Sequence, residues 1–310
     1  MDTNPPHVVL AGGSGHLGRH LARALVAAGT RVTVLSRRRP GHPDPDGVTT
    51  RLWDGRTLGP WVACLEDAAA VVNLTGKSVD CRYSAAALAE INASRVDSVH
   101  VLDAALGKCQ RPPPVLVQAA STALYGDAGK RPCAEDAPAG DGIPPETCIR
   151  WEAAVAYMRS PVRRVVLRIS FVLTSDGGGA LARLERITRC YLGGAIGSGR
   201  QWISWIHIDD FVRIVGRAIS DPRMAGVYNV TAPDPRPNAD FMRALRRALG
   251  RPWSPPTPAW AVYLGCWLMR TEPVLALTGR RAIPQRLLAD GFAFGYPDLD
   301  QALAALYPRR

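Results

Sequence analysis

Short apolar runs alternate with amphipathic segments through the first half of the chain. Residues 85–106 place Leu88, Ile91 and Val99 near one stripe at helical spacing. The other helical segments span 17–29 and 147–159, and the strand-like runs span 8–11, 31–36, 49–54, 70–76, 114–122 and 163–173. This alternation predicts an α/β fold of the Rossmann type, a doubly wound parallel sheet with helices on both faces. Ligands of such sheets lie at the carboxyl ends of the strands.

Beyond about residue 174 the pattern loosens. Helical segments at 180–190, 211–220 and 240–249 flank a strand-like run at 226–233, and a proline-rich connector covers 251–260. Asp209 or Asp210 is expected to cap the helix that follows them. We predict an NADP-binding Rossmann domain over 1–174, to which parts of 203–232 return. A smaller C-terminal α+β lobe over 175–310 would bind the substrate.

Composition narrows the possible partners. The chain is 47% hydrophobic and 21% charged, as globular proteins are, and its net charge of +11 comes from arginines spread in doublets. Such doublets are typical of solvated faces, so no nucleic-acid partner is expected. The longest apolar stretch, Trp260–Met269, is too short to span a bilayer, and we expect no secretory signal. Seven cysteines without a CxxC pair indicate reduced thiols in a cytoplasmic protein. We expect a monomer or a homodimer. No metal site is predicted.

Glycines follow the first strand-like run and precede the first helical one. Gly12, Gly15 and Gly18 stand three apart, and Gly13-x-Gly15-x-x-Gly18 fits the dinucleotide fingerprint. Glycine makes the tight turn, lets the backbone approach a pyrophosphate and lets the helix pack close to the strand. The phosphates would then meet the N–H groups at the helix start. The predicted phosphate-binding residues are Gly12, Gly13, Ser14, Gly15, His16, Leu17 and Gly18.

The residues that end the second strand favour NADP(H) as the cofactor. An acidic side chain there would accept bonds from the adenosine ribose. This chain has Ser36 followed by Arg37 and Arg38, and a guanidinium suits a 2′-phosphate. Asp54, after the third strand, is expected at the adenine edge. Further contacts are predicted from the end of the fourth strand, where Asn73, Leu74, Thr75 and Gly76 would run beneath the cofactor and Lys77 could reach its phosphates.

Four motifs, GGSGHLG, NLTG, STALYG and SWIHIDD, resemble those of the extended short-chain dehydrogenase/reductases. Longer stretches, among them GGAIGSGRQWISWIHIDD and AIPQRLLADGFAFGYPDL, resemble the atypical sugar-nucleotide epimerase-like branch of that family. The match covers nearly the whole chain. The resemblance implies a Rossmann domain that binds NADP(H) and a C-terminal substrate lobe.

The resemblance also implies a set of catalytic positions. The family's tyrosine exchanges a proton with the substrate, its lysine lowers the pKa of that tyrosine, and its serine polarises the carbonyl. Ser121 matches the serine, and Asn92 matches a helix asparagine that supports a proton relay. Cys148 and Glu152 stand where Tyr-x-x-x-Lys is expected, so the branch lacks the dyad. Tyr125, Cys148 and Glu152 are candidate proton donors, and a structural use is at least as plausible for each.

Substrate contacts are expected from the second lobe. Arg200, Gln201 and Trp202 follow a glycine turn, and the guanidinium of Arg200 suits an anionic or phosphorylated group. The alternation around Trp205 and His207 instead favours a core strand. The sequence therefore predicts an NADP(H)-dependent oxidoreductase or epimerase-like enzyme that acts on a small polar metabolite by hydride transfer. The alternatives are a non-catalytic NADP(H)-binding sensor, and a lyase or isomerase without net redox change.

Overall fold

A seven-stranded parallel sheet forms the centre of the molecule. The computed structural model describes residues 5–41 and 43–308. The strand order is β11-β7-β5-β4-β1-β2-β3, which confirms the predicted Rossmann-type fold. The strands are β1 (His7–Ala11), β2 (Arg31–Ser36), β3 (Val48–Leu52), β4 (Ala70–Asn73), β5 (Val115–Ser121), β7 (Arg163–Ile169) and β11 (Gly226–Val230).

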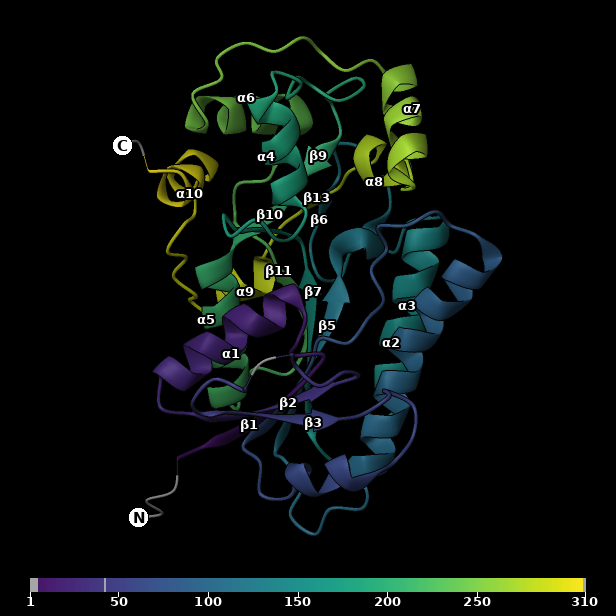
Figure 1. Ribbon diagram of the computed structural model, residues 1–310, viewed down its shortest axis with the longest axis vertical. Helices are drawn as coiled ribbons and strands as arrows, with labels where there is room; N and C mark the ends of the chain where they lie inside the picture. The colour runs from purple at the N-terminus through teal and green to yellow at the C-terminus, as the bar shows by residue number, and fades with distance from the viewer. Residues whose placement is uncertain (1–4, 42, 309–310) are drawn as a thin grey trace.

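Helices cover both faces of the sheet (Figure 1). α1 (His16–Ala27) and α5 (Ile208–Ser220) pack on one face, and α2 (Ala85–Leu106) and α3 (Ile143–Ala156) on the other. β1 shows why a continuous apolar run is needed. Val8 and Leu10 join the core beneath α1, whereas Val9 and Ala11 join the core beneath α2.

The strand predicted at 163–173 is two strands. Ser170 makes the last contact between this run and β11, since its N–H and its hydroxyl both donate to the carbonyl of Val230. The chain then leaves the main sheet, and β8 (Phe171–Leu173) pairs with β10 (Trp205–His207). The short strand β8 thereby carries the chain toward the second lobe.

The predicted cap of α5 is also wrong. His207 is the N-cap, and its Nδ1 accepts the N–H of Asp209 at 3.2 Å. Asp210 lies one turn too far along and is fully buried, where its carboxylate accepts the N–H groups of Gly295 and Tyr296. The Asp210 carboxylate therefore makes a tertiary contact with the C-terminal segment and does not cap the helix.

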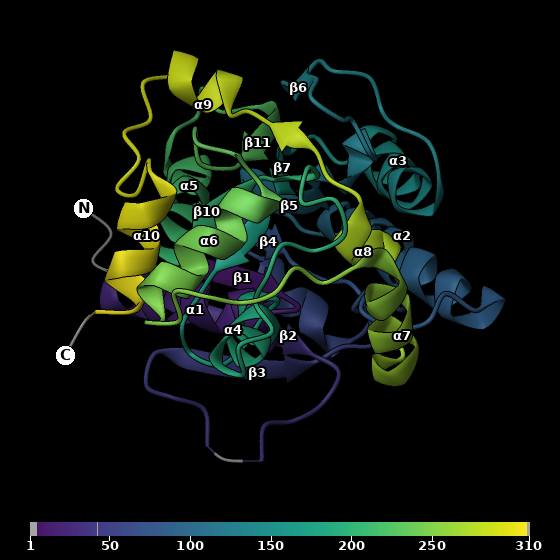
Figure 2. The same cartoon turned by 90° about the horizontal axis from the view of Figure 1, so that it is seen from above.

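The remaining elements gather above the carboxyl end of the sheet and beside it (Figures 1 and 2). Three of them precede β7 in the chain; the chain enters the others after β8, and between them it returns through β10, α5 and β11 to the main sheet. They are η1 (Pro60–Leu65), η2 (Thr122–Tyr125), β6 (Pro132–Cys133), α4 (Leu181–Arg189), β9 (Trp202–Ile203), β12 (Arg236–Pro237), α6 (Asn238–Ala248), α7 (Ala259–Met269), α8 (Val274–Leu277), β13 (Arg281–Ala282), α9 (Gln285–Ala289) and α10 (Leu299–Leu306). Among the residues described, no helix has the length and apolar character needed to cross a membrane.

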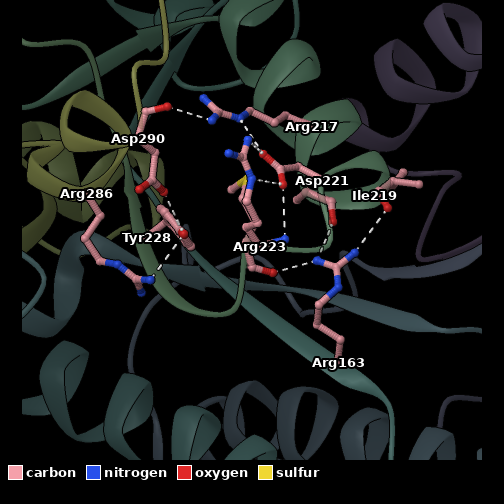
Figure 3. A network of polar contacts seen from close by, with 10 residues as sticks. Arg163, Arg217, Ile219, Asp221, Arg223, Tyr228, Arg286 and Asp290 are labelled. Atoms are coloured by element: carbon pink, nitrogen blue, oxygen red, sulfur yellow. Dashed lines mark hydrogen bonds and ion pairs between the residues drawn. The ribbon is translucent and has the colours of Figure 1, made fainter.

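Two adjacent arginines at the start of β7 cap helices on opposite faces. Arg163 donates to the carbonyls of Ala218 and Ile219 at the end of α5, as Figure 3 shows. Arg164 donates to the carbonyls of Val155 and others at the end of α3. Successive strand residues point to opposite faces, so one doublet serves both helices. Arg163 and Arg164 therefore bind helix ends, and they do not form the solvated face expected of arginine doublets.

The polar contacts in Figure 3 continue from α5 to α9. Arg217 donates to the carbonyl of Asp290 at 2.7 Å, and the hydroxyl of Tyr228 donates to the carboxylate of Asp290 at 2.9 Å. Arg286 of α9 donates in turn to the Tyr228 hydroxyl. The network ties the last strand of the sheet to the C-terminal segment.

Candidate functional site

The glycine turn after β1 lies against the loop after β4. Gly12 has a φ of +74°, and a Cβ on it would lie 3.0 Å from the backbone N and Cα of Thr75. A Cβ on Gly18 would lie 2.5 Å from the Cα of Gly13, so the helix start packs directly on the turn. Only glycine satisfies these positions. The spacing predicted from the sequence therefore has a steric cause at this switch point of the sheet.

The first turn of α1 offers its N–H groups to this edge. Gly15 is the N-cap and makes no side-chain bond, and the first turn contains no acidic residue. An uncapped helix start of this kind suits an anion. The ring of His16 instead contacts Thr174, with 3.0 Å between Nε2 and Oγ1. His16 thus offers only its backbone to a phosphate.

The ends of β2 and β3 form the next part of the edge. Ser36 is buried and donates its hydroxyl proton to Ser14 at 3.1 Å, whereas Arg37 and Arg38 are exposed. Asp54 accepts the hydroxyl of Thr57 at 2.7 Å and two backbone N–H groups, which lower its pKa to about 2. Asp54 is thus an ionised carboxylate that orders its own turn.

At the end of β4 the side-chain amide of Asn73 is fully hydrogen-bonded, whereas the hydroxyl of Thr75 is not bonded to any described residue. Asn73 donates to Gln118 at 2.9 Å and to Ser98, and it accepts the N–H of Thr75. The buried Oγ1 of Thr75 has no partner among the residues described, and neither has the buried Oδ1 of Asn92 on α2. Buried polar atoms are almost always bonded. These two atoms mark places where a bound molecule or water is needed.

Lys77 follows this loop and is held by α2. Its ammonium pairs with the carboxylate of Glu90, and its backbone N–H donates to Ser94 at 2.9 Å. Gly76 packs against Arg95, which donates to the carbonyls of Lys77 and Ile91. The Lys77 ammonium must exchange its partner before it could reach a phosphate.

Ser121 ends β5 and is half-buried. Its Oγ accepts the N–H of Ala123 at 3.1 Å, so the hydroxyl proton can be donated to another acceptor. Tyr125 follows on η2 and is fully buried. The Tyr125 hydroxyl lies 2.9 Å from the carbonyl of Ala134 and 2.8 Å from Oδ1 of Asn229, and it accepts a bond from Arg168 at 2.8 Å. The bonding capacity of this hydroxyl is fully used within the protein.

Glu152 lies in the same network. Both of its oxygens accept hydrogen bonds of 2.8 Å from Arg168, and this bidentate ion pair joins α3 to β7. Cys148 lies one turn before Glu152 and is buried, and burial, reinforced by the Glu152 charge, raises its pKa to about 12. The structure thus brings Tyr125, Cys148 and Glu152 together around Arg168. An arginine inside the apolar run RRVVLRI was the available sequence signal, and our sequence analysis missed it.

A model of the NAD dependent epimerase/dehydratase family matches residues 8–231, from β1 to the residue after β11. The chain belongs to this family. The cattle epimerase family protein SDR39U1 is 36% identical over 301 residues, which are 96% of this chain and 98% of the relative. A chloroplastic homologue from Arabidopsis thaliana is 32% identical over 96% of this chain and 86% of its own. The cytoplasmic location therefore stays a prediction.

A solved structure agrees with this assignment. The crystal structure of human epimerase family protein SDR39U1 with NADPH superposes with a TM-score of 0.84 at 33% identity, over 97% of this chain and 99% of that one. The predicted membership in the epimerase-like branch of the extended short-chain dehydrogenase/reductases is confirmed. A second model, a domain of unknown function, matches residues 257–306, which contain α7 to α10.

The three predicted substrate-contact residues of the second lobe differ in how their side chains are bonded. Gln201 is bound internally, since its amide donates to the carbonyls of Ile196 and Ala276. Trp202 is half-buried with the guanidinium of Arg281 4.9 Å from its ring centre, and Arg200 is exposed. Arg200 and Trp202 thus stay candidates for ligand contact.

Two further arginines were missed by the sequence analysis. Arg95 of α2 and Arg280, just before β13, both act electrostatically on the Cys148 thiol, and burial lowers the pKa of each guanidinium. Arg95 also stacks on Trp151, 4.9 Å from the ring centre. Neither has an ion-paired carboxylate within the described part of the chain. Two cations that face the same thiol suit an anionic ligand group.

Proposed function

We propose that this chain is an NADP(H)-dependent oxidoreductase or epimerase-like enzyme that acts on a small polar metabolite with an anionic group. One observation carries the proposal. The Gly12 turn approaches the Thr75 backbone, beside the uncapped start of α1 and a buried Thr75 hydroxyl without a partner. A dinucleotide pyrophosphate fits this set of donors. The human relative of known structure contains NADPH.

The preference for NADP(H) rests on the end of β2. Ser36, Arg37 and Arg38 place no carboxylate there to repel a 2′-phosphate, and both arginines are exposed. A guanidinium at this position binds a phosphate through charge-assisted hydrogen bonds.

Ser121 is the residue of this site that can assist the reaction. NADPH, when bound, supplies a hydride. The Ser121 hydroxyl donates to the carbonyl oxygen of the substrate, which becomes negative as the C–H bond forms and the C=O double bond opens. Solvent water supplies the proton that completes the alcohol. Tyr125 and Glu152 hold Arg168 in place, and Arg95 and Arg280 attract the anionic group of the substrate.

To test this role, wild type or Ser121→Ala is mixed with NADPH and fractions of a metabolite extract, and the oxidation of NADPH is followed by the absorbance of its nicotinamide. We expect one fraction to oxidise NADPH, and we expect Ser121→Ala to lower the rate about 100-fold, the usual loss for one oxyanion donor. NADPH affinity should stay within about twofold, because Ser121 binds the substrate oxygen. Ser220→Ala, exposed at the end of α5, is the matched control. Equal rates for wild type and Ser121→Ala would refute the role of Ser121.

A second candidate function is a non-catalytic NADP(H)-binding protein. The saturated hydroxyl of Tyr125 and the paired carboxylate of Glu152 favour it, since the Tyr125 proton is bonded to an internal acceptor and the carboxylate of Glu152 carries none. It predicts tight NADPH binding, no oxidation by any metabolite fraction, and a binding partner whose affinity changes between NADPH and NADP⁺. Substrate-dependent oxidation of NADPH would exclude it.

A further inference from the structure

A cluster of three metal-ligating side chains joins α1 to the loop after β8. His16 and His20 stand one turn apart on α1, and Asp176 lies in the loop at 174–180. The carboxylate Oδ2 of Asp176 is 2.9 Å from Nε2 of His20 and 3.7 Å from Nδ1 of His16. All three ligand atoms lie within 4.8 Å of one another.

The hydrogen bonds around His16 fix its tautomer. Thr174 donates its hydroxyl proton to the carbonyl of Gly178, so Thr174 Oγ1 accepts from the His16 ring at Nε2, 3.0 Å away. The proton of the imidazole is therefore on Nε2, and the lone pair is on Nδ1. That Nδ1 is buried and has no hydrogen-bond partner among the described residues. A lone pair and a carboxylate oxygen thus face each other with no proton between them.

The distances match a tetrahedral metal site. Ligands at about 2.0–2.1 Å from zinc lie roughly 3.4 Å apart, and the two distances to Asp176 lie on either side of this value. The Thr174 hydroxyl orients His16 as outer-shell groups orient metal-bound histidines. Gly178 passes beside the ring, where a Cβ would overlap Nδ1. Asp176 Oδ1 accepts the N–H of Gly178 at 3.2 Å, which leaves Oδ2 for the cluster.

We propose that His16, His20 and Asp176 bind a divalent cation of the zinc type, with a fourth coordination position open to solvent at the exposed Asp176. Two imidazoles and one carboxylate suit zinc, nickel or copper rather than magnesium, which prefers oxygen ligands. The bound ion would link the start of α1 to a loop 158 residues further along the chain. The proposed function uses only the backbone of His16 and neither His20 nor Asp176, so the metal site, which uses the His16 ring, does not rest on it.

The test is calorimetric titration of the chelator-treated full-length chain with zinc chloride. We expect one site per chain in wild type and an affinity about 100-fold weaker in His20→Asn and in Asp176→Asn. Thr174→Val, which removes only the orienting hydroxyl, should weaken binding about 10-fold. His100→Asn, exposed on α2, is the matched control and should bind like wild type. Circular dichroism verifies that each variant is folded.

The visible spectrum of bound Co²⁺ distinguishes this site from a site formed by cysteines. Co²⁺ bound by two histidines and a carboxylate should give a visible spectrum without the intense thiolate charge-transfer band that Cys ligands produce. Zinc should also raise the melting temperature of wild type and of His100→Asn but not of Asp176→Asn. A thiolate band, a zinc affinity unchanged in both ligand variants, or no zinc binding by wild type would each overturn the proposal. In the last case His20 and Asp176 form only an ion pair.

Discussion

The two halves of the carboxyl edge of the sheet differ in how their polar groups are satisfied. On the side of β1, β2 and β4, the buried Thr75 hydroxyl has no partner and the start of α1 has no cap. On the side of β5 and β7, Tyr125 and Glu152 are fully bonded around Arg168. The first half has a buried hydroxyl and a helix start that still need a partner. In the second half the network of Tyr125, Glu152 and Arg168 is closed, although Trp151 Nε1 beside it is without a partner among the described residues.

This difference teaches how to weigh candidate residues. A buried polar atom without a partner destabilises the fold by about 1–3 kcal/mol, so it is retained where something else uses it. A saturated network needs no ligand. Tyr125, Cys148 and Glu152 carry the residue types of proton donors, but their burial and their internal bonds favour a structural role. Ser121, half-buried at the end of β5, keeps a proton to donate.

The largest expected effect concerns Cys148. Its pKa is raised to about 12, so the thiol is protonated at every pH below that value and thiolate appears only as the pH approaches it. At pH 8 its thiolate fraction is about 1000-fold below that of an ordinary exposed thiol. Iodoacetamide should therefore label the exposed Cys190 and spare Cys148, as peptide mass spectrometry would show. Equal labelling of both would mean that the second half is open and reactive.

Breaking the ion pair in the second half should destabilise the protein. Arg168→Met leaves the Glu152 carboxylate buried without its partner, and we expect the free energy of unfolding to fall by about 3 kcal/mol. Urea denaturation of wild type and Arg168→Met measures this difference in the free energy of unfolding. Combining it with Glu152→Gln should recover part of the loss, because the charge is removed as well. Asp240→Asn, which breaks the exposed pair with Arg243, is the control and should change little. An unchanged stability in Arg168→Met would remove the structural role of the network.

Much of the fold follows from short-range patterns. The buried run of β1 and the packing of Gly18 on Gly13 involve residues close together in the chain, so the sequence alone predicts them. The partners of the catalytic candidates are long-range. Arg168 lies 43 residues from Tyr125 and 16 from Glu152, and Asn229 lies 104 residues from Tyr125. No spacing rule links them, so only the folded chain shows that these groups satisfy one another.

Gly12→Ala tests the first half directly. The new Cβ would strain a backbone with φ of +74° and press on the Thr75 backbone at 3.0 Å. We expect NADPH affinity to fall about 100-fold, measured by nicotinamide fluorescence. Gly216→Ala on α5 is the matched control, because its Cβ meets nothing within 4 Å and helix propensity should raise stability slightly. Wild-type affinity in Gly12→Ala would show that the edge is not the cofactor site.

The smallest expected effect distinguishes the two nicotinamide cofactors. Arg37→Ala removes the exposed guanidinium after β2, and NADPH affinity should fall about 10-fold while NADH affinity stays constant, because only NADPH has the 2′-phosphate. Arg39→Ala, also exposed and two residues further on, controls for the loss of one positive charge. Equal losses for both cofactors would mean that Arg37 acts through general attraction of anions. A loss for NADPH alone would mean that Arg37 contacts the 2′-phosphate directly. A charge acting at a distance would be screened by salt, and it would attract the phosphates of both cofactors alike.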